Sequence, residues 1–175
     1  VENQLGKVDY LEGFMQDITQ QREAEISITK EKELLYKYLN TTASIFMVIN
    51  LEHKITMVNQ KACEVMGYKA DEMVGKNWFN HYILKSDRKE LTHLFGLIIK
   101  GKLEQPYAKE NWVIAKGNKR KLIRWRNALL KDENGKVTGL ISSGIEVTEQ
   151  VVAENQLRDS VEKNAAILKA IPDVM

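Results

Sequence analysis

The sequence has one cysteine and no long apolar run, and each shortage excludes a class of protein. Cys63 alone cannot form an internal disulfide or a multi-cysteine zinc site, which is typical of a reducing compartment. No stretch reaches the roughly 20 apolar residues that cross a bilayer, and the sequence shows no signal peptide. We therefore expect a cytoplasmic chain without a membrane segment.

A surplus of one charge is also lacking, because the formal net charge is only +2 and the Lys and Arg residues are scattered. The densest basic run, residues 116–121, falls where a hairpin turn is expected and is interpreted as a solvated turn. This distribution is not the electrostatic footprint of a nucleic-acid-binding protein. We expect no nucleic-acid partner.

Motifs of catalysis are missing as well. The sequence has no Gly-rich phosphate loop, no His/Cys/Asp set with metal-ligand spacing, and no Ser or Cys nucleophile near a His. We therefore interpret the chain as non-catalytic.

What is present is a central stretch, from Ile45 to Thr148, in which strand and helix patterns follow one another. Asn59 fits the N-cap of a first short helix, and Gly67 fits its left-handed stop. The predicted elements are strands at 45–50 and 54–58, helices at 60–66, 70–73 and 78–83, a longer helix ending at Gly101, and strands at 107–115, 122–131 and 137–147. This order predicts an α+β fold with an antiparallel sheet and helices on one face.

The two ends of the chain resemble each other at a fixed offset of 129 positions, without a gap. Gly6-Lys7-Val8 matches Gly135-Lys136-Val137, and Asp17-Ile18-Thr19 matches Glu146-Val147-Thr148. A fixed internal period is the signature of tandem units. The sequence therefore predicts a parent protein that is an array of such units.

Each end also carries a helical linker that begins after a threonine, Thr19 or Thr148, whose hydroxyl is predicted to act as N-cap. Apolar residues recur at coiled-coil spacing and form a predicted helix seam: Ile28, Leu35 and Leu39 in the first linker, and Leu157, Val161, Asn164 and Leu168 in the second. Lys32 and Asn164 interrupt this seam, which predicts weak association. The alternative is that each helix packs on its own core.

The pieces of the central stretch, taken in order, resemble the PAS family of sensor domains. The pieces that carry the resemblance are Ile45-Phe46-Met47-Val48, Val58-Asn59-Gln60-Lys61-Ala62, Gly67-Tyr68, Asp71-Glu72-Met73-Val74-Gly75, Trp78-Phe79, and the segment from Leu130 through Gly139 to Thr148. The resemblance implies a five-stranded antiparallel sheet in the order 2-1-5-4-3, with a cavity between sheet and helices. It also implies a place in a multidomain signalling protein, most often a sensor histidine kinase or a cyclic-dinucleotide enzyme.

This resemblance gives the chain its expected domains. Residues 1–19 end a preceding PAS-like unit, 20–40 form a linker helix, 41–148 form the PAS domain, 149–170 form a second linker helix, and 171–175 start a following unit. Asp17 with Thr19, and Glu146 with Thr148, look like the family's junction motif, in which the acid pairs across the domain and the threonine caps the exit helix. By that analogy they couple the core to the helix.

A second expectation concerns the inward-facing residues, which would line a ligand pocket or fill the core completely. They are Met57, Met66, Trp78, Phe79, Leu91, Phe95, Ile98, Trp112, Ile114, Ile123, Trp125, Ile141 and Ser143, with Ser142 as a further polar candidate. No metal and no firm cofactor is predicted. Cys63 is not in the position of the reactive cysteine of light-sensing members, and a haem would need His93 or His81.

Two hypotheses follow. In the first, the chain is a signal-relay and dimerisation module whose linker helices pair with those of a second copy. Adjacent PAS or kinase domains of the same chain would then be its other partners, although neither linker holds the His of a kinase phosphoacceptor helix. In the second, the domain binds a small molecule or a cofactor such as haem or flavin. Protein docking on the open face of the sheet is a third option.

Overall fold

The computed structural model of the chain describes residues 16–104 and 106–170, with the side chains of residues 167–170 left out. Its contacts divide the chain into two units, residues 1–37 and residues 38–175, and each unit is described by itself. The predicted end of a preceding unit, up to residue 15, and the predicted start of a following unit at 171–175 lie outside the described residues. The preceding unit and the following unit therefore remain predictions from the sequence.

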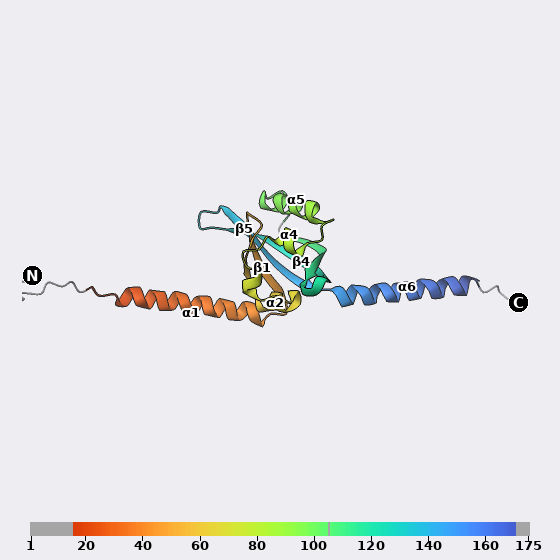
Figure 1. Cartoon of the computed structure of the whole chain (residues 1–175), viewed down its shortest axis with the longest axis horizontal. Helices are drawn as coiled ribbons and strands as arrows, with labels where there is room; N and C mark the ends of the chain where they lie inside the picture. The colour runs from red at the N-terminus through yellow and green to blue at the C-terminus, as the bar shows by residue number, and fades with distance from the viewer. Residues whose placement is uncertain (1–15, 105, 171–175) are drawn as a thin grey trace, which may run out of the picture. The chain divides into compact units, whose positions relative to one another are not determined.

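The elements follow one another as the sequence pattern indicates (Figure 1). They are α1 (Thr19–Thr41), β1 (Ile45–Asn50), β2 (Ile55–Val58), α2 (Gln60–Met66), α3 (Ala70–Met73), α4 (Trp78–Tyr82), α5 (Arg88–Ile99), β3 (Tyr107–Ala115), the short 3₁₀ turn η1 (Lys116–Asn118), β4 (Lys119–Lys131), β5 (Val137–Glu146) and α6 (Thr148–Ala170). None of the helices described has the length and apolar character needed to cross a membrane.

All five strands form one antiparallel sheet in the order β2-β1-β5-β4-β3, which confirms the predicted fold class and strand order. The central strand β5 therefore pairs with β1 on one side and with β4 on the other. Met47 lies opposite Ser142 across β1 and β5, and Trp125 lies opposite Gly144 across β4 and β5. These pairings determine which side chains face the helices.

The sequence signals at Asn59 and Gly67 predicted the position of the short helix α2 correctly. The Asn59 side chain accepts a hydrogen bond from the Ala62 N–H and caps α2, and Gly67 ends α2 in the left-handed conformation at φ 74°. Only a residue without a Cβ adopts that conformation without steric cost, which is why the helix stops there.

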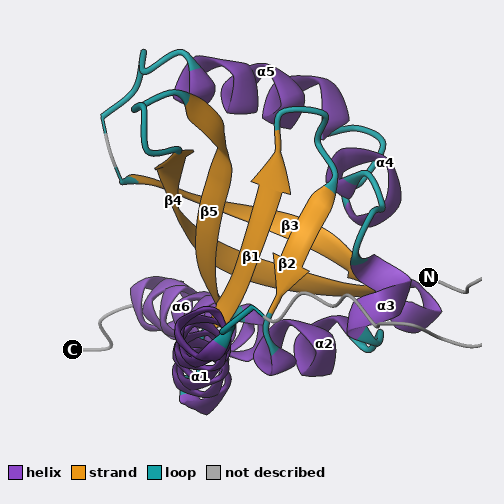
Figure 2. Ribbon diagram, turned by 90° about the vertical axis from the view of Figure 1, so that its left-hand side faces the viewer, coloured by secondary structure: helices purple, strands orange, loops and turns teal. Residues whose placement is uncertain are grey.

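The hydrophobic core lies between one face of the sheet and the short helices, and Figure 2 shows α2 to α5 arranged around the sheet. Alternate residues of β1, namely Ile45, Met47 and Ile49, are each 2% exposed. From the helical side come buried residues such as Met66, Met73, Trp78, Phe79, Phe95 and Ile98. This layered core is the site where a pocket was expected.

Five residues predicted to face inward lie instead on the opposite face of the sheet, which corrects the expectation. They are Met57, Trp112, Ile114, Ile141 and Ser143. Side chains alternate between the two faces of a strand, so the core side is taken by their buried neighbours, such as Val113 and Ser142. The strand pairing supports this assignment. Val48 lies opposite both Met57 and Ile141, so these three side chains share one face of the sheet. Met47 and Ile49, the neighbours of Val48 in β1, lie on the other face.

Candidate functional site

The core contains a small cavity, about 60 Å³ in volume, between the sheet and the helices α4 and α5. Seven of the predicted residues line it: Trp78, Phe79, Leu91, Phe95, Ile98, Trp125 and the further polar candidate Ser142. Met66 and Ile123 are buried in the same core but do not line the cavity. Whether a ligand occupies this space stays a prediction.

Three polar residues in the lining were missed by the sequence analysis. Lys109 and Asn111 come from β3, and Asn127 comes from β4. Next to them Ser142, only 2% exposed, donates a hydrogen bond to Asn127 Oδ1 at 2.7 Å. The one signal that could have found them is their two-residue spacing with Val113 and with Trp125, because strand residues at that spacing share a face.

The cavity is small because aromatic rings fill most of the core. Trp78 packs edge-on against Trp125 with ring centroids 5.7 Å apart, and Phe79 packs edge-on against Phe95 at the same distance. His53 packs edge-on against both phenylalanine rings. A space of this size holds a few water-sized groups, whereas drug-sized ligands need about 300 Å³ or more.

The side chains needed for the cofactor chemistries are not at this cavity. His81 and His93 are exposed and do not line it, so neither fits as a haem ligand there. Cys63 lies on α2 outside the lining, and burial raises the pKa of its thiol, which keeps the thiol protonated. Among the residues that the structure describes, no group of three or more His, Cys, Asp or Glu could hold a metal ion.

The C-terminal junction, which we define as Glu146, Thr148 and their partners, links β5, β4 and α6. The Thr148 hydroxyl accepts a hydrogen bond from the Leu122 N–H at 2.9 Å and donates to Glu146 Oε1 at 3.1 Å. Lys121 donates to the same carboxylate oxygen at 2.7 Å. Thr148 therefore binds the end of the sheet, which corrects its predicted role as the cap of the exit helix.

The N-terminal junction differs from prediction in the same way. The helix α1 begins at Thr19, and the Thr19 N–H donates to Asp17 Oδ1 at 2.9 Å. Asp17, and not Thr19 as predicted, therefore provides the side-chain oxygen that accepts a hydrogen bond at the start of α1. Hydrogen bonds from Thr19 hold the pKa of the Asp17 carboxyl below its ordinary value.

Replacing Thr148 with valine is expected to lower the free energy of unfolding by about 1–2 kcal/mol, because the partly buried Leu122 N–H loses its acceptor. Thr148→Ser keeps the hydroxyl and is the control. The two variants are compared by urea unfolding followed by circular dichroism. Equal stability of the two would show that the hydroxyl contributes nothing at this junction.

Comparison with known proteins decides the family. A family model described as "PAS domain" matches residues 42–149, more than half of the chain. The chain belongs to the PAS family. No curated protein matches the chain.

Solved structures share the fold of this chain at low sequence identity. A PAS domain from Colwellia psychrerythraea is 16% identical, with a TM-score of 0.60, and the match covers 70% of this chain and 98% of that one. A sensory box histidine kinase/response regulator from Burkholderia thailandensis is 18% identical, with a TM-score of 0.53 and coverage of 71% and 92%. The PAS domain of the quorum-sensing receptor RpfR from Cronobacter turicensis, in complex with BDSF, is 21% identical, with a TM-score of 0.51 and coverage of 61% and 96%.

Proposed function

We propose that this PAS domain is a non-catalytic signal-relay and dimerisation module of a cytoplasmic multidomain signalling protein such as a sensor histidine kinase. It passes a signal through α1 and α6 to adjacent PAS or kinase domains of the same chain. Membership of the PAS family supports the sensory role. The Burkholderia neighbour is itself named a histidine kinase, which motivates the choice of parent protein.

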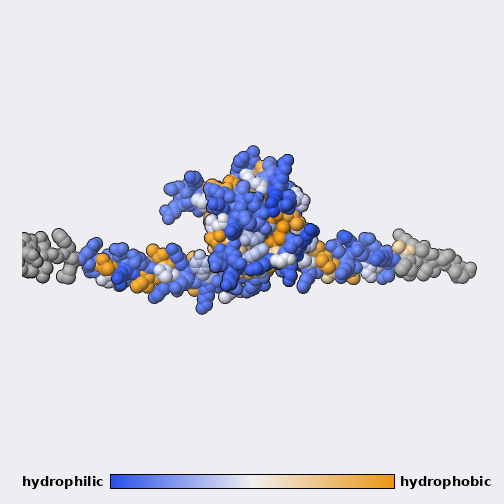
Figure 3. All heavy atoms as spheres, in the orientation of Figure 1, coloured by the Kyte–Doolittle hydropathy of each residue, from blue (hydrophilic) through white to orange (hydrophobic). Residues whose placement is uncertain are grey.

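The observation that carries this proposal is the exposure of the apolar residues in the helix seam. Ile28 and Leu35 of α1 are 53% and 61% exposed, and Leu157 and Val161 of α6 are 68% and 59% exposed. Figure 3 shows hydrophobic side chains on the surface of both helices. Fully burying such a side chain is worth about 1.5–3 kcal/mol, and burial of these residues against a second copy would contribute this to pairing.

Two members of the seam stand apart from this exposed set. Leu39 is half-buried, and the side chain of Leu168 is outside those described.

The polar position Asn164 is exposed, and Lys32 interrupts the seam of α1. Polar seam residues reduce the stability of a coiled coil and leave alternative packings close in energy. A joint of this kind can change state when a signal shifts the balance between two packings.

Asn164→Leu is expected to tighten dimerisation by about tenfold or more, because it adds a buried apolar side chain to each helix of the pair. Asn155→Leu, on the same helix but two residues before Leu157 and off the seam, is the matched control. Sedimentation equilibrium gives the dimer dissociation constant of each variant. An unchanged constant for Asn164→Leu, or an equal gain for Asn155→Leu, would show that the seam does not drive dimerisation.

A second candidate function is that of a small-molecule sensor, and the cavity with its polar wall favours it. The PAS domain of the Cronobacter quorum-sensing receptor is in complex with BDSF, which motivates a test of ligand binding by this chain. Native mass spectrometry of the purified chain separates the candidates. Extra mass that disappears on denaturation supports the sensor, and the bare mass of a dimer supports the relay.

A further inference from the structure

Asn59 is a fully hydrogen-bonded polar side chain inside the core, at the connection between β2 and α2, and it is only 2% exposed. Its Oδ1 atom accepts from the Phe46 N–H at 2.9 Å and from the Ala62 N–H at 3.0 Å. Its Nδ2 atom donates to the carbonyls of Leu39 at 2.8 Å and Ser44 at 2.9 Å. Both amide hydrogens and both acceptor positions of Asn59 are therefore used.

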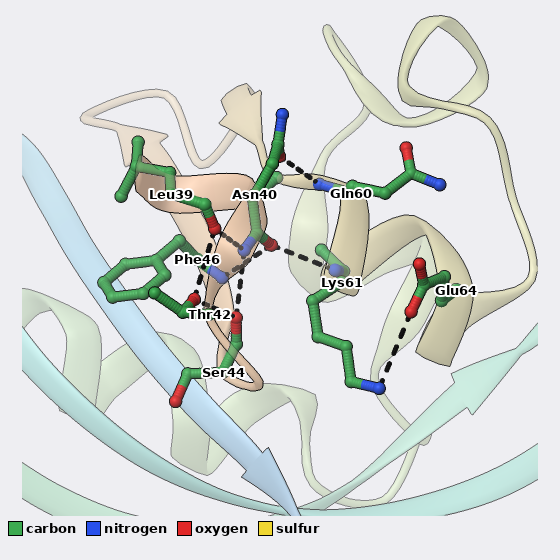
Figure 4. Close-up of polar contacts among 10 residues, drawn as sticks. Leu39, Asn40, Thr42, Ser44, Phe46, Gln60, Lys61 and Glu64 are labelled. Atoms are coloured by element: carbon green, nitrogen blue, oxygen red, sulfur yellow. Dashed lines mark hydrogen bonds and ion pairs between the residues drawn. The ribbon is translucent and has the colours of Figure 1, made fainter. Parts of the chain in front are cut away.

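These four bonds join different parts of the fold. Phe46 belongs to β1 and Ala62 to the first turn of α2, whereas Leu39 lies in the last turn of α1 and Ser44 in the segment that follows it. Figure 4 shows the labelled residues Leu39, Ser44 and Phe46 converging on this point. The C-terminal carbonyls of a helix have no partner within the helix, so the Leu39 carbonyl depends on donors outside it. Asn59 is the buried one of these donors, and the exposed Thr42 hydroxyl also donates to the Leu39 carbonyl at 3.1 Å and to the Ser44 carbonyl at 3.3 Å.

A second contact runs parallel to the first. The side chain of Asn40 accepts from the Gln60 N–H at 2.8 Å, which also joins the last turn of α1 to the start of α2 (Figure 4). Asn40 is exposed and Asn59 is buried, so the two bonds differ in strength. We call Asn59 and Asn40 with their bonds the asparagine clamp.

The two halves of the Asn59 amide have separate tasks. The amide oxygen binds the core, because it accepts a hydrogen bond from the Phe46 N–H of β1 and caps α2 by accepting from the Ala62 N–H. The nitrogen serves the flanking segment, because both of its hydrogens go to residues between 39 and 44. A displacement of β1 or of the start of α2 therefore has to carry the last turn of α1 with it or leave the buried amide hydrogens of Asn59 unpaired, which is costly.

We propose that Asn59 is a positioning residue that transmits changes in the PAS core to the end of α1. This inference rests on the proposed relay function and adds a route at the N-terminal helix to the junction at Glu146 and Thr148. The signal enters through the residues that Asn59 accepts from and leaves through the carbonyls to which it donates.

Asn59→Asp separates the two halves, because the carboxyl group keeps both acceptor bonds, loses both donor bonds and places an oxygen against the Leu39 and Ser44 carbonyls, which repel it. Hydrogen exchange is measured over residues 36–41, and we expect it to be at least about tenfold faster than in the wild type, with β1 and β5 unchanged. Asn77→Asp is the matched control, since Asn77 also caps a helix, α4, through its oxygen. Unchanged exchange over residues 36–41, or equal loosening of the core strands, overturns the proposal.

Asn40→Ala is the second variant if Asn59→Asp fails to fold. It removes only the exposed bond to the Gln60 N–H, and we expect exchange over residues 36–41 to rise about fivefold. Wild-type exchange in Asn40→Ala would overturn the clamp in that case.

Transmission itself is tested with Leu91→Ala, which changes the cavity wall on α5. In the wild-type background this substitution is expected to shift the amide resonances of residues 38–41, and in the Asn59→Asp background the shifts should fall by at least half. Equal shifts in both backgrounds overturn transmission through Asn59. Sedimentation of the same samples tests dimerisation separately, so a failure of the relay proposal is distinguished from a failure of the clamp.

Discussion

Trp125→Ala is expected to lower the free energy of unfolding by about 3–5 kcal/mol, whereas Trp112→Ala lowers it by less than about 1 kcal/mol. Trp125 is 5% exposed, lines the cavity and packs edge-on against Trp78. Its removal leaves a large space that rigid neighbours fill only in part. Trp112 is 36% exposed and lies on the opposite face of the sheet, where solvent replaces the lost contacts.

The measurement is urea unfolding of both variants, followed by far-ultraviolet circular dichroism so that the signal does not depend on tryptophan emission. Trp112 serves as the control, because both substitutions remove the same side chain from neighbouring strands of one sheet. If the two substitutions lowered the free energy of unfolding by similar amounts, the conclusion that Trp125 faces the core and Trp112 the opposite side of the sheet would be contradicted. A folded Trp125→Ala protein would also have an enlarged cavity next to Trp78.

The contrast between these two tryptophans shows why the pocket was predicted only in part. The segment Trp112-Val113-Ile114 is apolar on both faces, so its sequence cannot reveal which residues face the core. The pairing with β4 decides it, since Trp112 lies opposite Leu122 and Asn111 lies opposite Ile123. Such information depends on strands that are far apart in sequence.

Features with a local cause were predictable. The order of elements, the Asn59 cap and the stop at Gly67 agree with the structure. The strand order is not a local feature; it was implied by the family resemblance, and it agrees as well. Asn59 also shows where local signals end. The acceptor half of its amide serves Ala62, three residues away, and was expected, but its donor half reaches Leu39, twenty residues away. No spacing pattern indicates that second partner.

The polar lining of the cavity was missed for a related reason. Lys109, Asn111 and Asn127 have the composition of a solvent-facing strand edge, and only the fold turns them toward the helices. Lys109 reaches Glu90 on α5, where the two side chains form an ion pair. This pair lies at the side of the cavity where β3 and α5 meet, and it allows a cationic residue to lie beside an apolar core.

Gly139→Ala is expected to cost about 3 kcal/mol or more, because β5 and β1 approach too closely at this position for a side chain. A Cβ atom on Gly139 would overlap the Ile49 carbonyl oxygen and lie 3.2 Å from the Asn50 Cα. Both obstacles are backbone atoms of a central strand pair, so neither can rotate away as a flexible side chain would. Relief requires the two strands to separate, which weakens the hydrogen bonds between them.

Gly96→Ala is the matched control for that substitution. Gly96 lies within α5, and a Cβ atom there would meet nothing within 4 Å. Alanine is a better helix former than glycine, so this variant is expected to gain about 0.5–1 kcal/mol. Urea unfolding of both variants should therefore move the midpoint in opposite directions. If Gly139→Ala were as stable as the wild type, β1 and β5 could not be paired in the register Ile49 opposite Leu140.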